Sequence, residues 1–224
     1  MKALKLKLFQ ETACYKKPFA LKVAETYPLP PYSTVKGFLH YVLEAEDFVD
    51  MAISVQGDYE DKFINLQTFY FYKQNEITKG PLNVHYLHNV ELLIHVYAKE
   101  AILNKIIENM KNSKEFFSLG RREDLVRIDD IKMVEFRKVD LDEEDDIYGL
   151  KYSAYIPKFY NYEALTGINY NLNFKYNIKN EIREWEKVKV VYVEKDSNVI
   201  TNGKIYLDNE GDIIFFNKKV GEIV

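Results

Sequence analysis

Apolar residues recur along this chain with two different spacings, which predict alternating strands and helices. Residues 2–10 alternate leucines with lysines, and such alternation is typical of a strand with one buried face. Residues 35–43 and 102–110 instead carry apolar side chains at helical spacing. Further alternating stretches predict strands at residues 48–56, 63–72, 90–96 and 125–136. The order is therefore strand, helix, strand, strand, helix, strand.

This order predicts an α+β fold with a βαββαβ ferredoxin-like or RRM-like sheet. Ser33 or Thr34 is expected to cap the first helix. A polar turn at residues 73–81, which contains Gly80, predicts the tip of a hairpin that interrupts the sheet. In this topology the loop after the second helix lies beside the sheet, where related folds place ligands.

The chain beyond residue 138 differs from the preceding part in its charge and in its pattern of apolar residues. Residues 139–150 are rich in aspartate and glutamate, and like charges favour a solvated, extended linker. A metal site is less favoured there, because the carboxylates lack the spaced oxygen ligands of a cation loop. Alternating stretches then predict a β-rich extension over residues 151–224, in which residues 209–212 form a hairpin turn.

Composition narrows the function classes. The chain has 224 residues, 47% of them hydrophobic, and a net charge of −4, as expected of an ordinary globular protein. The acidic balance argues against a free-standing, non-specific nucleic-acid binder, although a local basic groove remains compatible with it. The single cysteine, Cys14, excludes an internal disulfide and a Cys/His zinc cluster. With neither a signal-peptide pattern nor a membrane-length apolar stretch, a cytoplasmic protein is expected.

The first candidate site is Gly120 with the adjacent guanidinium groups of Arg121 and Arg122. Glycine lets the backbone adopt positive φ and approach a ligand, and arginine matches phosphate oxygens with a fixed fork of donors. One interpretation is therefore that this segment binds the phosphates of a nucleic-acid backbone. The other is a helix C-cap at Gly120, followed by solvated charges that pair with Glu123 and Asp124.

The second candidate site is the proline-led segment at residues 27–37. Its prolines stiffen the approach to the first helix, whose first turn would offer free amides, the hydroxyls of Ser33 and Thr34 and the Lys36 ammonium. Such a set suits a phosphate. Gly37 weakens the helix, so close packing or ligand approach is needed to explain it. The alternative is a helix cap without a ligand.

Catalytic patterns are sparse. His85 and His88 form an H-x-x-H pair, but no third ligand follows at metal spacing, so we expect neither a metal nor a cofactor. The chain has no phosphate-binding glycine loop and no G-x-S-x-G elbow. A metal-independent ribonuclease could use Lys36, His40, Tyr41 and His88. The simpler reading is that these are polar residues on exposed faces.

Taken together, the two candidate segments resemble the CRISPR-associated Cas5 family, in a form most similar to its type I-B branch. The match runs through residues 27–37 and 118–124 and spans residues 1–138. The resemblance implies a structural subunit of the Cascade surveillance complex, which caps the 5′ handle of the guide RNA (crRNA) in antiviral defence. It implies an RNA-binding domain at residues 1–138 with a hairpin thumb at about 68–90. The large subunit and a backbone subunit would be its neighbours, and target DNA would be contacted only through the complex.

Carried over by motif, position or nearby charge, the residues expected to contact RNA are Gly120, Arg121, Arg122, Tyr32, Ser33, Thr34, Lys36, Gly37, Lys16, Lys17, His85 and His88. Tyr15, Tyr32, Tyr70 and Tyr72 are candidate stacking platforms for bases. Another branch of the family, type I-C, cleaves precursor guide RNA with Tyr, Lys and His side chains, and no clear counterpart of that trio is found here. We therefore expect no catalysis, with a ribonuclease and a protein-only interaction module as the alternatives.

Overall fold

The structure is a computed structural model that describes residues 1–18, 20, 23–74, 76–141, 148–162, 165–195, 199–200 and 203–222. Its two α-helices are α1 (Tyr32–Leu43) and α2 (Glu100–Asn112). The longer strands are β1 (Lys2–Ala13), β3 (Ala52–Asp58), β4 (Asp61–Lys73), β5 (Glu76–Tyr97), β7 (Leu125–Asp140), β9 (Ser153–Pro157), β10 (Ile168–Lys179), β11 (Ile182–Val193) and β13 (Lys204–Asp208). Two-residue strands are β2 (Val23–Ala24), β6 (Phe117–Ser118), β8 (Tyr148–Gly149), β12 (Val199–Ile200) and β14 (Ile213–Ile214). Short 3-10 helices cover Lys158–Tyr160 and Val220–Glu222.

The centre of the sheet has the predicted ferredoxin-like arrangement. Its strands run in the order β3-β5-β1-β7, and every neighbouring pair is antiparallel. In β1, Leu6 pairs with Ile94 on one side and Ile131 on the other. Because the helices follow β1 and β5 in the chain, this is the βαββαβ order expected from the hydrophobic periodicity.

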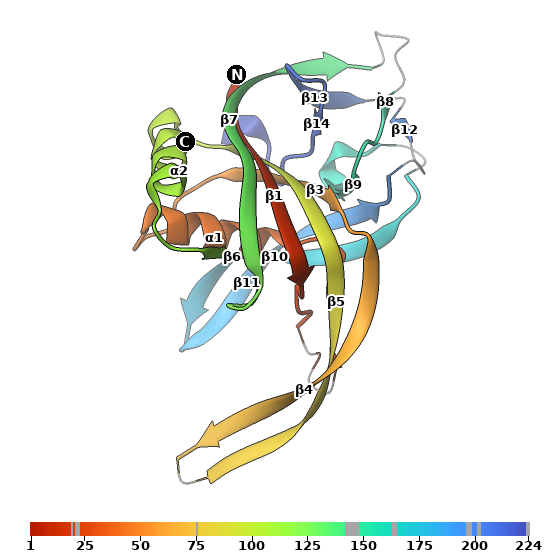
Figure 1. The fold of residues 1–224 in the computed structure, drawn as a ribbon. Coiled ribbons are helices and arrows are strands. Elements are labelled where there is room, and N and C mark those ends of the chain that lie inside the picture. Colours follow the sequence, from red (N-terminus) through yellow and green to blue (C-terminus); the bar gives the residue numbers. More distant parts are fainter. Residues whose placement is uncertain are drawn as a thin grey trace.

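Both helices cover the same face of this central sheet (Figure 1). Leu4, Leu6 and Leu8 of β1 are buried in one core with apolar residues of α1 and α2, such as Leu39 and Ile106. The alternate residue Lys5 lies on the opposite face, where it is covered by the end of the chain. No helix among the described residues is long and apolar enough to cross a membrane.

The last third of the chain extends the same sheet at both edges. β9 pairs with β3, and β11 and β10 follow, while β13 and β14 continue beyond β7. β7 runs past the predicted boundary at residue 138, so residues 139 and 140 are strand in this structure. Residues 142–147 of the predicted acidic linker lie outside the described residues.

Two hairpins project from the body of the protein, one formed by β4 and β5 and the other by β10 and β11 (Figure 1). The first hairpin closes between the paired residues Lys73 and Glu76, whereas Gly80 lies within β5 opposite Phe69. The predicted hairpin tip within residues 73–81 is confirmed, but Gly80 itself lies in the strand and not in the turn. β4 and β5 extend by regular pairing through residues 77–80, and the Gly80 backbone packs on the Phe69 ring.

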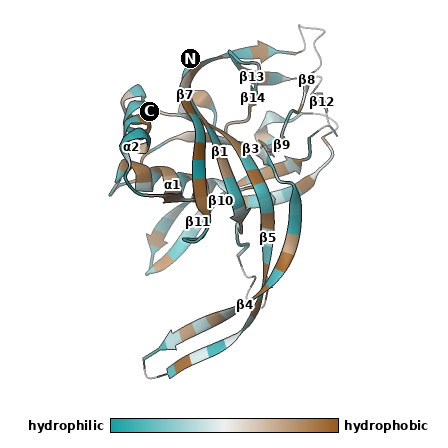
Figure 2. Ribbon diagram, in the orientation of Figure 1, coloured by the Kyte–Doolittle hydropathy of each residue, from teal (hydrophilic) through white to brown (hydrophobic). Residues whose placement is uncertain are grey.

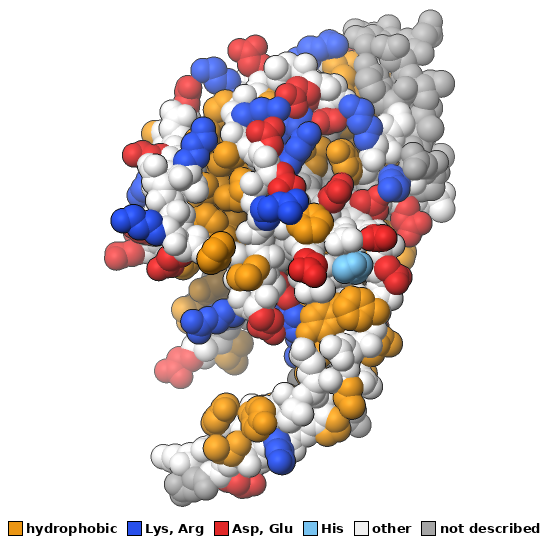
Figure 3. All heavy atoms as spheres, in the orientation of Figure 1, with side chains coloured by type: hydrophobic (Ala, Val, Ile, Leu, Met, Phe, Trp, Pro, Cys, Tyr) orange, Lys and Arg blue, Asp and Glu red, His pale blue; other side chains and the backbone are white. Residues whose placement is uncertain are grey.

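Apolar and polar residues alternate along the β4–β5 hairpin, and apolar side chains remain exposed on it (Figures 2 and 3). Ile64, Leu66, Phe71, Tyr72 and Ile77 are each at least 60% exposed. An apolar surface of this size on a two-stranded arm is unusual for a free monomer, since isolated hairpins gain little from packing on themselves. These apolar side chains are therefore left open to contact with another molecule.

A buried ionic cluster joins the end of the chain to the centre of the sheet. The Lys5 ammonium donates to Asp208 at 2.6 Å, to Glu210 at 2.8 Å and to Asp212. His95, which pairs with Lys5 in the sheet, lies 3.2 Å from the same Asp208 oxygen. The three carboxylates could otherwise surround a metal ion, but here the Lys5 side chain supplies the positive charge.

Candidate functional site

The segment with Gly120 is a tight turn between β6 and β7. Leu119 N–H donates to the Asp124 carbonyl at 3.0 Å, and Asp124 N–H donates to the Arg121 carbonyl at 3.1 Å. Gly120 has φ of 110°, a region that residues with side chains rarely adopt. The alternative reading of Gly120 as a helix C-cap is wrong, because α2 ends at Asn112 with Ser113 as its C-cap and β6 intervenes.

The Asp124 carboxylate organises this turn from inside. It is 1% exposed and accepts hydrogen bonds from the Cys14 and Arg121 backbone N–H groups at 3.1 and 3.0 Å. A Cβ at Gly120 would lie 3.0 Å from the same carboxylate, so glycine is needed for space as well as for φ. The turn is thus held rigidly beside the end of β1.

Arg121 points inward, against the expectation that its guanidinium grips a phosphate. Its Nε and Nη2 donate to the two Asp124 oxygens at 3.0 and 2.6 Å. Its Nη1 donates to the Tyr86 hydroxyl at 3.1 Å, and the guanidinium lies over the Tyr86 ring. A buried carboxylate recruits the nearest guanidinium, since an unpaired buried charge is costly. Arg121 therefore holds the turn against β5.

Arg122 points the other way. Its side chain is exposed, and its guanidinium has no hydrogen-bond or ion-pair partner within the described part of the chain. Its carbonyl accepts a 2.7 Å hydrogen bond from the Ser118 hydroxyl, which fixes the backbone from which the side chain projects. Of the two adjacent arginines, Arg122 is the one available to an external anion.

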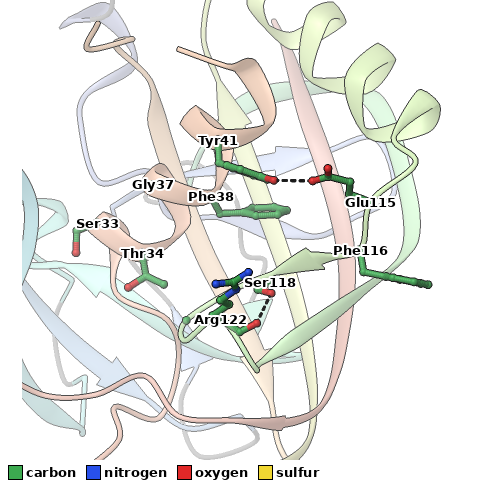
Figure 4. A pocket seen from close by; sticks show the side chains of 10 residues that line it. Ser33, Thr34, Gly37, Phe38, Tyr41, Glu115, Phe116, Ser118 and Arg122 are labelled. Atoms are coloured by element: carbon green, nitrogen blue, oxygen red, sulfur yellow. Dashed lines mark hydrogen bonds between the residues drawn. The ribbon is translucent and has the colours of Figure 1, made fainter. Parts of the chain in front are cut away.

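The two segments singled out in the sequence meet at one pocket of about 680 Å³. Figure 4 shows Thr34, Phe38 and Tyr41 of α1 along one side and Ser118 and Arg122 of the turn facing them. The Tyr41 hydroxyl donates to Glu115 at 3.0 Å across the far end (Figure 4). We call this space the α1–turn pocket. Its complete lining is Ser33, Thr34, Gly37, Phe38, Tyr41, Glu115, Phe116, Ser118, Gly120 and Arg122.

The first turn of α1 contributes hydroxyls to this pocket. The N-cap is Pro31, whose carbonyl accepts from the N–H groups of Thr34 at 2.9 Å and Val35 at 3.2 Å. The predicted capping by Ser33 or Thr34 is therefore wrong: the fixed φ of proline starts the helix two residues earlier. Because neither hydroxyl is used as a cap, both lack a hydrogen-bond partner among the described residues.

Gly37 lies in the second turn of α1 and borders the pocket. A Cβ placed there would meet no heavy atom within 4 Å. Helical glycine costs about 1 kcal/mol relative to alanine. Nothing in the protein's own packing requires glycine at this position, so the missing side chain leaves space on the outer surface of the helix.

Lys36 does not join the α1–turn pocket. It lines a second pocket of about 580 Å³ between α1, the segment after it and the β10–β11 hairpin. Burial, together with the charges of Lys175 and Lys218, lowers the pKa of Lys36 to about 8. The anion site that the sequence predicted as one unit is therefore split: Thr34 lines the first pocket, Lys36 the second, and Ser33 and Gly37 line both.

Other predicted contacts lie away from the α1–turn pocket. The Lys17 ammonium pairs with Glu25 at 3.2 Å, and Lys16 is exposed beside it. His85 and His88 lie on β5, where the His88 ring contacts the Glu11 carbonyl. None of these four residues lines a described pocket.

The expected tyrosine platforms divide into two groups. Tyr15 and Tyr32 are 2% and 0% exposed, so neither offers a ring face to a base, and that prediction is wrong for both. Core packing accounts for them, since Tyr32 packs against Tyr155 and the Tyr15 hydroxyl donates to Gln10. Tyr70 and Tyr72 are exposed and stack on each other along β4.

His40 has little freedom to act as a base. Its Nδ1 lies 2.9 Å from the Lys36 carbonyl, and its Nε2 accepts from the Val49 N–H at 2.9 Å. These bonds fix a neutral tautomer, and burial lowers the pKa of His40. The ring therefore closes the end of α1 against the following loop.

Several residues that line the two pockets were not predicted from the sequence. Phe38, Ser118 and Phe116 border the α1–turn pocket, and Phe174, Lys175 and Trp185 border the second. Phe38 looked like an ordinary core position of the helix stripe, and it is indeed 5% exposed. The β10 and β11 residues carry no motif, and only the pairing of distant strands brings them to α1.

A family model and solved structures match this chain. The family described as CRISPR-associated protein (Cas_Cas5) matches residues 3–186. A chain from a structure titled "CRISPR RNA-guided surveillance complex" is 13% identical, with a TM-score of 0.59, and the match covers 86% of this chain and 90% of that one. A CRISPR protein from Archaeoglobus fulgidus is 12% identical with a TM-score of 0.47, covering 96% and 98%. No curated protein matches the sequence.

Proposed function

The chain belongs to the CRISPR-associated Cas5 family, and we propose that it is a non-catalytic subunit of a type I Cascade complex that binds the 5′ handle of the guide RNA. The type I-B branch, indicated by the proline-led segment, is part of the proposal. In this role the protein caps one end of the complex in antiviral defence. The similarity of its fold to a chain of an RNA-guided surveillance complex supports the proposal.

The observation that carries the proposal is the α1–turn pocket. It joins two segments far apart in the sequence. It also offers the Arg122 guanidinium and the hydroxyls of Ser33 and Thr34, which have no hydrogen-bond partner in the part of the chain that the structure describes. These are donors suited to phosphate oxygens. The exposed Phe116 and Tyr41 rings at the same pocket suit stacking on unpaired bases, which is how proteins recognise single-stranded RNA.

The exposed apolar arm formed by β4 and β5 supports contacts with protein neighbours. The apolar residues toward its tip, such as Phe71, Tyr72 and Ile77, are 60–77% exposed and so gain little from packing on the body of the protein. In the proposal this hairpin, the predicted thumb, contacts the backbone subunit, and the large subunit lies nearby. A subunit held by protein neighbours needs no strong overall positive charge, in agreement with its net charge of −4.

The absence of catalysis is part of the proposal. Of the residues considered for a ribonuclease, His40 uses both ring nitrogens within the fold. Tyr41 is committed to Glu115, and Lys36 lines a different pocket. Purified protein incubated with repeat RNA in EDTA is expected to leave the RNA intact. Site-specific cleavage there would instead establish the ribonuclease alternative.

RNA binding is tested by titrating labelled repeat-derived handle RNA with the wild type and with Arg122→Ala. We expect about a tenfold loss of affinity, the effect of removing one well-placed charged contact. Arg137→Ala is the matched control, because Arg137 is an exposed arginine that lines no described pocket. Equal affinities for all three proteins would contradict the proposal, as would a complex that assembles without RNA contact by this subunit.

A further inference from the structure

The second pocket shares only Ser33 and Gly37 with the first. It lies between α1, the segment that follows it and the β10–β11 hairpin, and we call it the α1–hairpin pocket. Lys36, Phe48, Phe174, Lys175, Tyr176 and Trp185 are the lining residues that matter here. The hairpin, more than a hundred residues further along the chain, thus shares one concave surface with α1 and the segment after it.

Lys36 is the main observation. The residue is 9% exposed, yet its ammonium has no carboxylate or other hydrogen-bond acceptor within the described part of the chain. It lies 4.8 Å from the Phe48 ring centroid and 4.7 Å from that of Phe174. Buried lysines are normally paired, because desolvating an ammonium is costly. Aromatic faces offset only part of that cost, so the site favours an anion.

The charges around Lys36 do not neutralise it. Lys175 and Lys218 both repel its proton, while Glu186 and Asp50 act weakly in the opposite direction. Asp50 is taken by the Lys218 ammonium, and Glu186 accepts from the Asn177 amide at 3.0 Å. Glu46 and Asp47 also line the pocket, but neither forms an ion pair with Lys36. Among the described residues, the ammonium groups of Lys36 and Lys175 therefore have no carboxylate partner.

Aromatic rings border the same pocket. Trp185 of β11 pairs with Tyr176 of β10, and their rings meet at 5.2 Å between centroids. Both are more than a third exposed, as is Phe48. Base–aromatic stacking contributes about 1–3 kcal/mol per base in proteins that bind single-stranded nucleic acid. Unpaired ammonium groups beside exposed rings are the chemistry that holds a nucleotide.

The two pockets are adjacent. Ser33 and Gly37, one turn apart on α1, line both of them and form the low ridge between them. Because serine is small and Gly37 has no side chain, a strand could cross α1 at this point. The open space at Gly37, which core packing leaves unexplained, then has a use.

We propose that the α1–hairpin pocket is a second nucleotide site, in which one base of the bound strand stacks against Trp185 or Tyr176 and its phosphate pairs with Lys36 and Lys175. The strand is the single-stranded RNA of the proposed function, on which this inference rests, and it passes from one pocket to the other over Ser33 and Gly37. The β10–β11 hairpin thereby takes part in RNA binding.

Trp185 is the only tryptophan of the chain, so its fluorescence reports on this pocket directly. Handle RNA added to the wild type, excited where tyrosine does not absorb, is expected to quench the emission in a saturable titration. Lys36→Met and Lys175→Gln should each lower the RNA affinity measured by this titration about tenfold, whereas Lys179→Met should leave it unchanged. Lys179 is the matched control because it is an exposed lysine on β10 that lines no described pocket.

The pH dependence of RNA affinity distinguishes a charge contact made by Lys36 from a purely structural role of this residue. Lys36 loses its proton as the pH rises through about 8, so affinity for RNA should fall over that range. Lys36→Arg keeps its charge throughout and should bind with a flatter pH profile. If the melting curve shows that Lys36→Met does not fold, the binding measurements on Lys175→Gln and Lys36→Arg provide the test instead.

The outcomes distinguish this inference from the proposed function. Unchanged Trp185 emission on binding of handle RNA, with affinity still sensitive to Arg122→Ala, overturns the second site alone. Quenching that persists at full strength in both Lys36→Met and Lys175→Gln also overturns it. If the wild-type protein does not bind handle RNA in either assay, the proposed function itself is overturned.

Discussion

The Arg121 guanidinium holds the buried Asp124 carboxylate with two hydrogen bonds, of 3.0 and 2.6 Å, and is therefore turned away from the α1–turn pocket. Its neighbour Arg122 has no such partner among the described residues and lines that pocket. The adjacent arginines thus differ: Arg121 holds the turn, and Arg122 faces the pocket.

Arg121→Ala should reduce stability, whereas Arg122→Ala should not. Removing Arg121 leaves Asp124 buried without its cation, which costs about 3 kcal/mol by comparison with other broken buried pairs. Arg122 is exposed, so its loss should change the free energy of unfolding by less than about 0.5 kcal/mol. Urea denaturation of the two variants measures both. Equal stabilities would show that the Arg121–Asp124 pair is not a structural contact.

Gly37→Ala should change stability and binding in opposite directions. An alanine Cβ there meets no heavy atom within 4 Å, and alanine favours the helix over glycine by about 1 kcal/mol. The variant should therefore melt at a higher temperature than the wild type but bind handle RNA less tightly. Gly37→Leu should weaken binding further, since the longer side chain fills the ridge between the pockets. Unchanged RNA affinity in the leucine variant would contradict this role for Gly37.

The stability contribution of Lys36 should depend on pH. Its folded-state pKa of about 8 lies below the ordinary lysine pKa of 10.5, so between these values the unfolded chain binds more protons. The free energy of unfolding then rises with pH over that window. Lys36→Met lacks this proton, and the melting temperature of the wild type relative to the variant should rise from pH 8 to 10.5. A constant difference would mean that Lys36 titrates normally in the folded protein.

Lys5 should be essential for joining the end of the chain to the sheet. Lys5→Met leaves Asp208 and Asp212 without their shared cation, a loss of about 4 kcal/mol for a buried network. Burial raises the pKa of Asp208, but hydrogen bonds from His95 and Lys5 outweigh it and hold the pKa below its usual range. The Lys5 contribution is therefore largest above the usual aspartate pKa. It should shrink as the pH falls and the carboxylates take up protons.

Guanidinium denaturation at neutral and acid pH checks this prediction. A wild type and Lys5→Met pair with equal stability at neutral pH would contradict the structural role of the cluster. Lys7→Met serves as the control, because Lys7 lies on the same strand and its ammonium forms no ion pair within the described ranges.

The central fold could be predicted from the sequence because its elements carry periodic patterns. Leu4, Leu6 and Leu8 alternate with lysines, and the apolar positions of α1 recur at helical spacing, so the βαββαβ order follows locally. The ends of the individual elements were predicted less accurately than their order. The turn predicted within residues 73–81 closes between Lys73 and Glu76, so it is shorter than predicted and Gly80 lies in the paired strand.

The roles of individual side chains depended on contacts that the sequence does not contain. Arg121 and Arg122 are equivalent in the printed sequence, and only the buried carboxylate of Asp124 separates them. Lys36 and Thr34 are two residues apart on a helix, so they face different pockets. Trp185 could not be linked to α1 from the sequence, because the pairing of β9 with β3 brings that hairpin beside the helix.

The most direct test of RNA binding at the α1–turn pocket is ultraviolet cross-linking of handle RNA to the wild-type protein, followed by mass spectrometry of the linked peptides. We predict cross-links in residues 33–41 and 116–122, where Phe116 and Tyr41 are exposed beside Arg122. They should weaken together in Arg122→Ala and persist in Arg137→Ala. Cross-links confined to other parts of the chain, with none at these two segments, would contradict the assignment of the site.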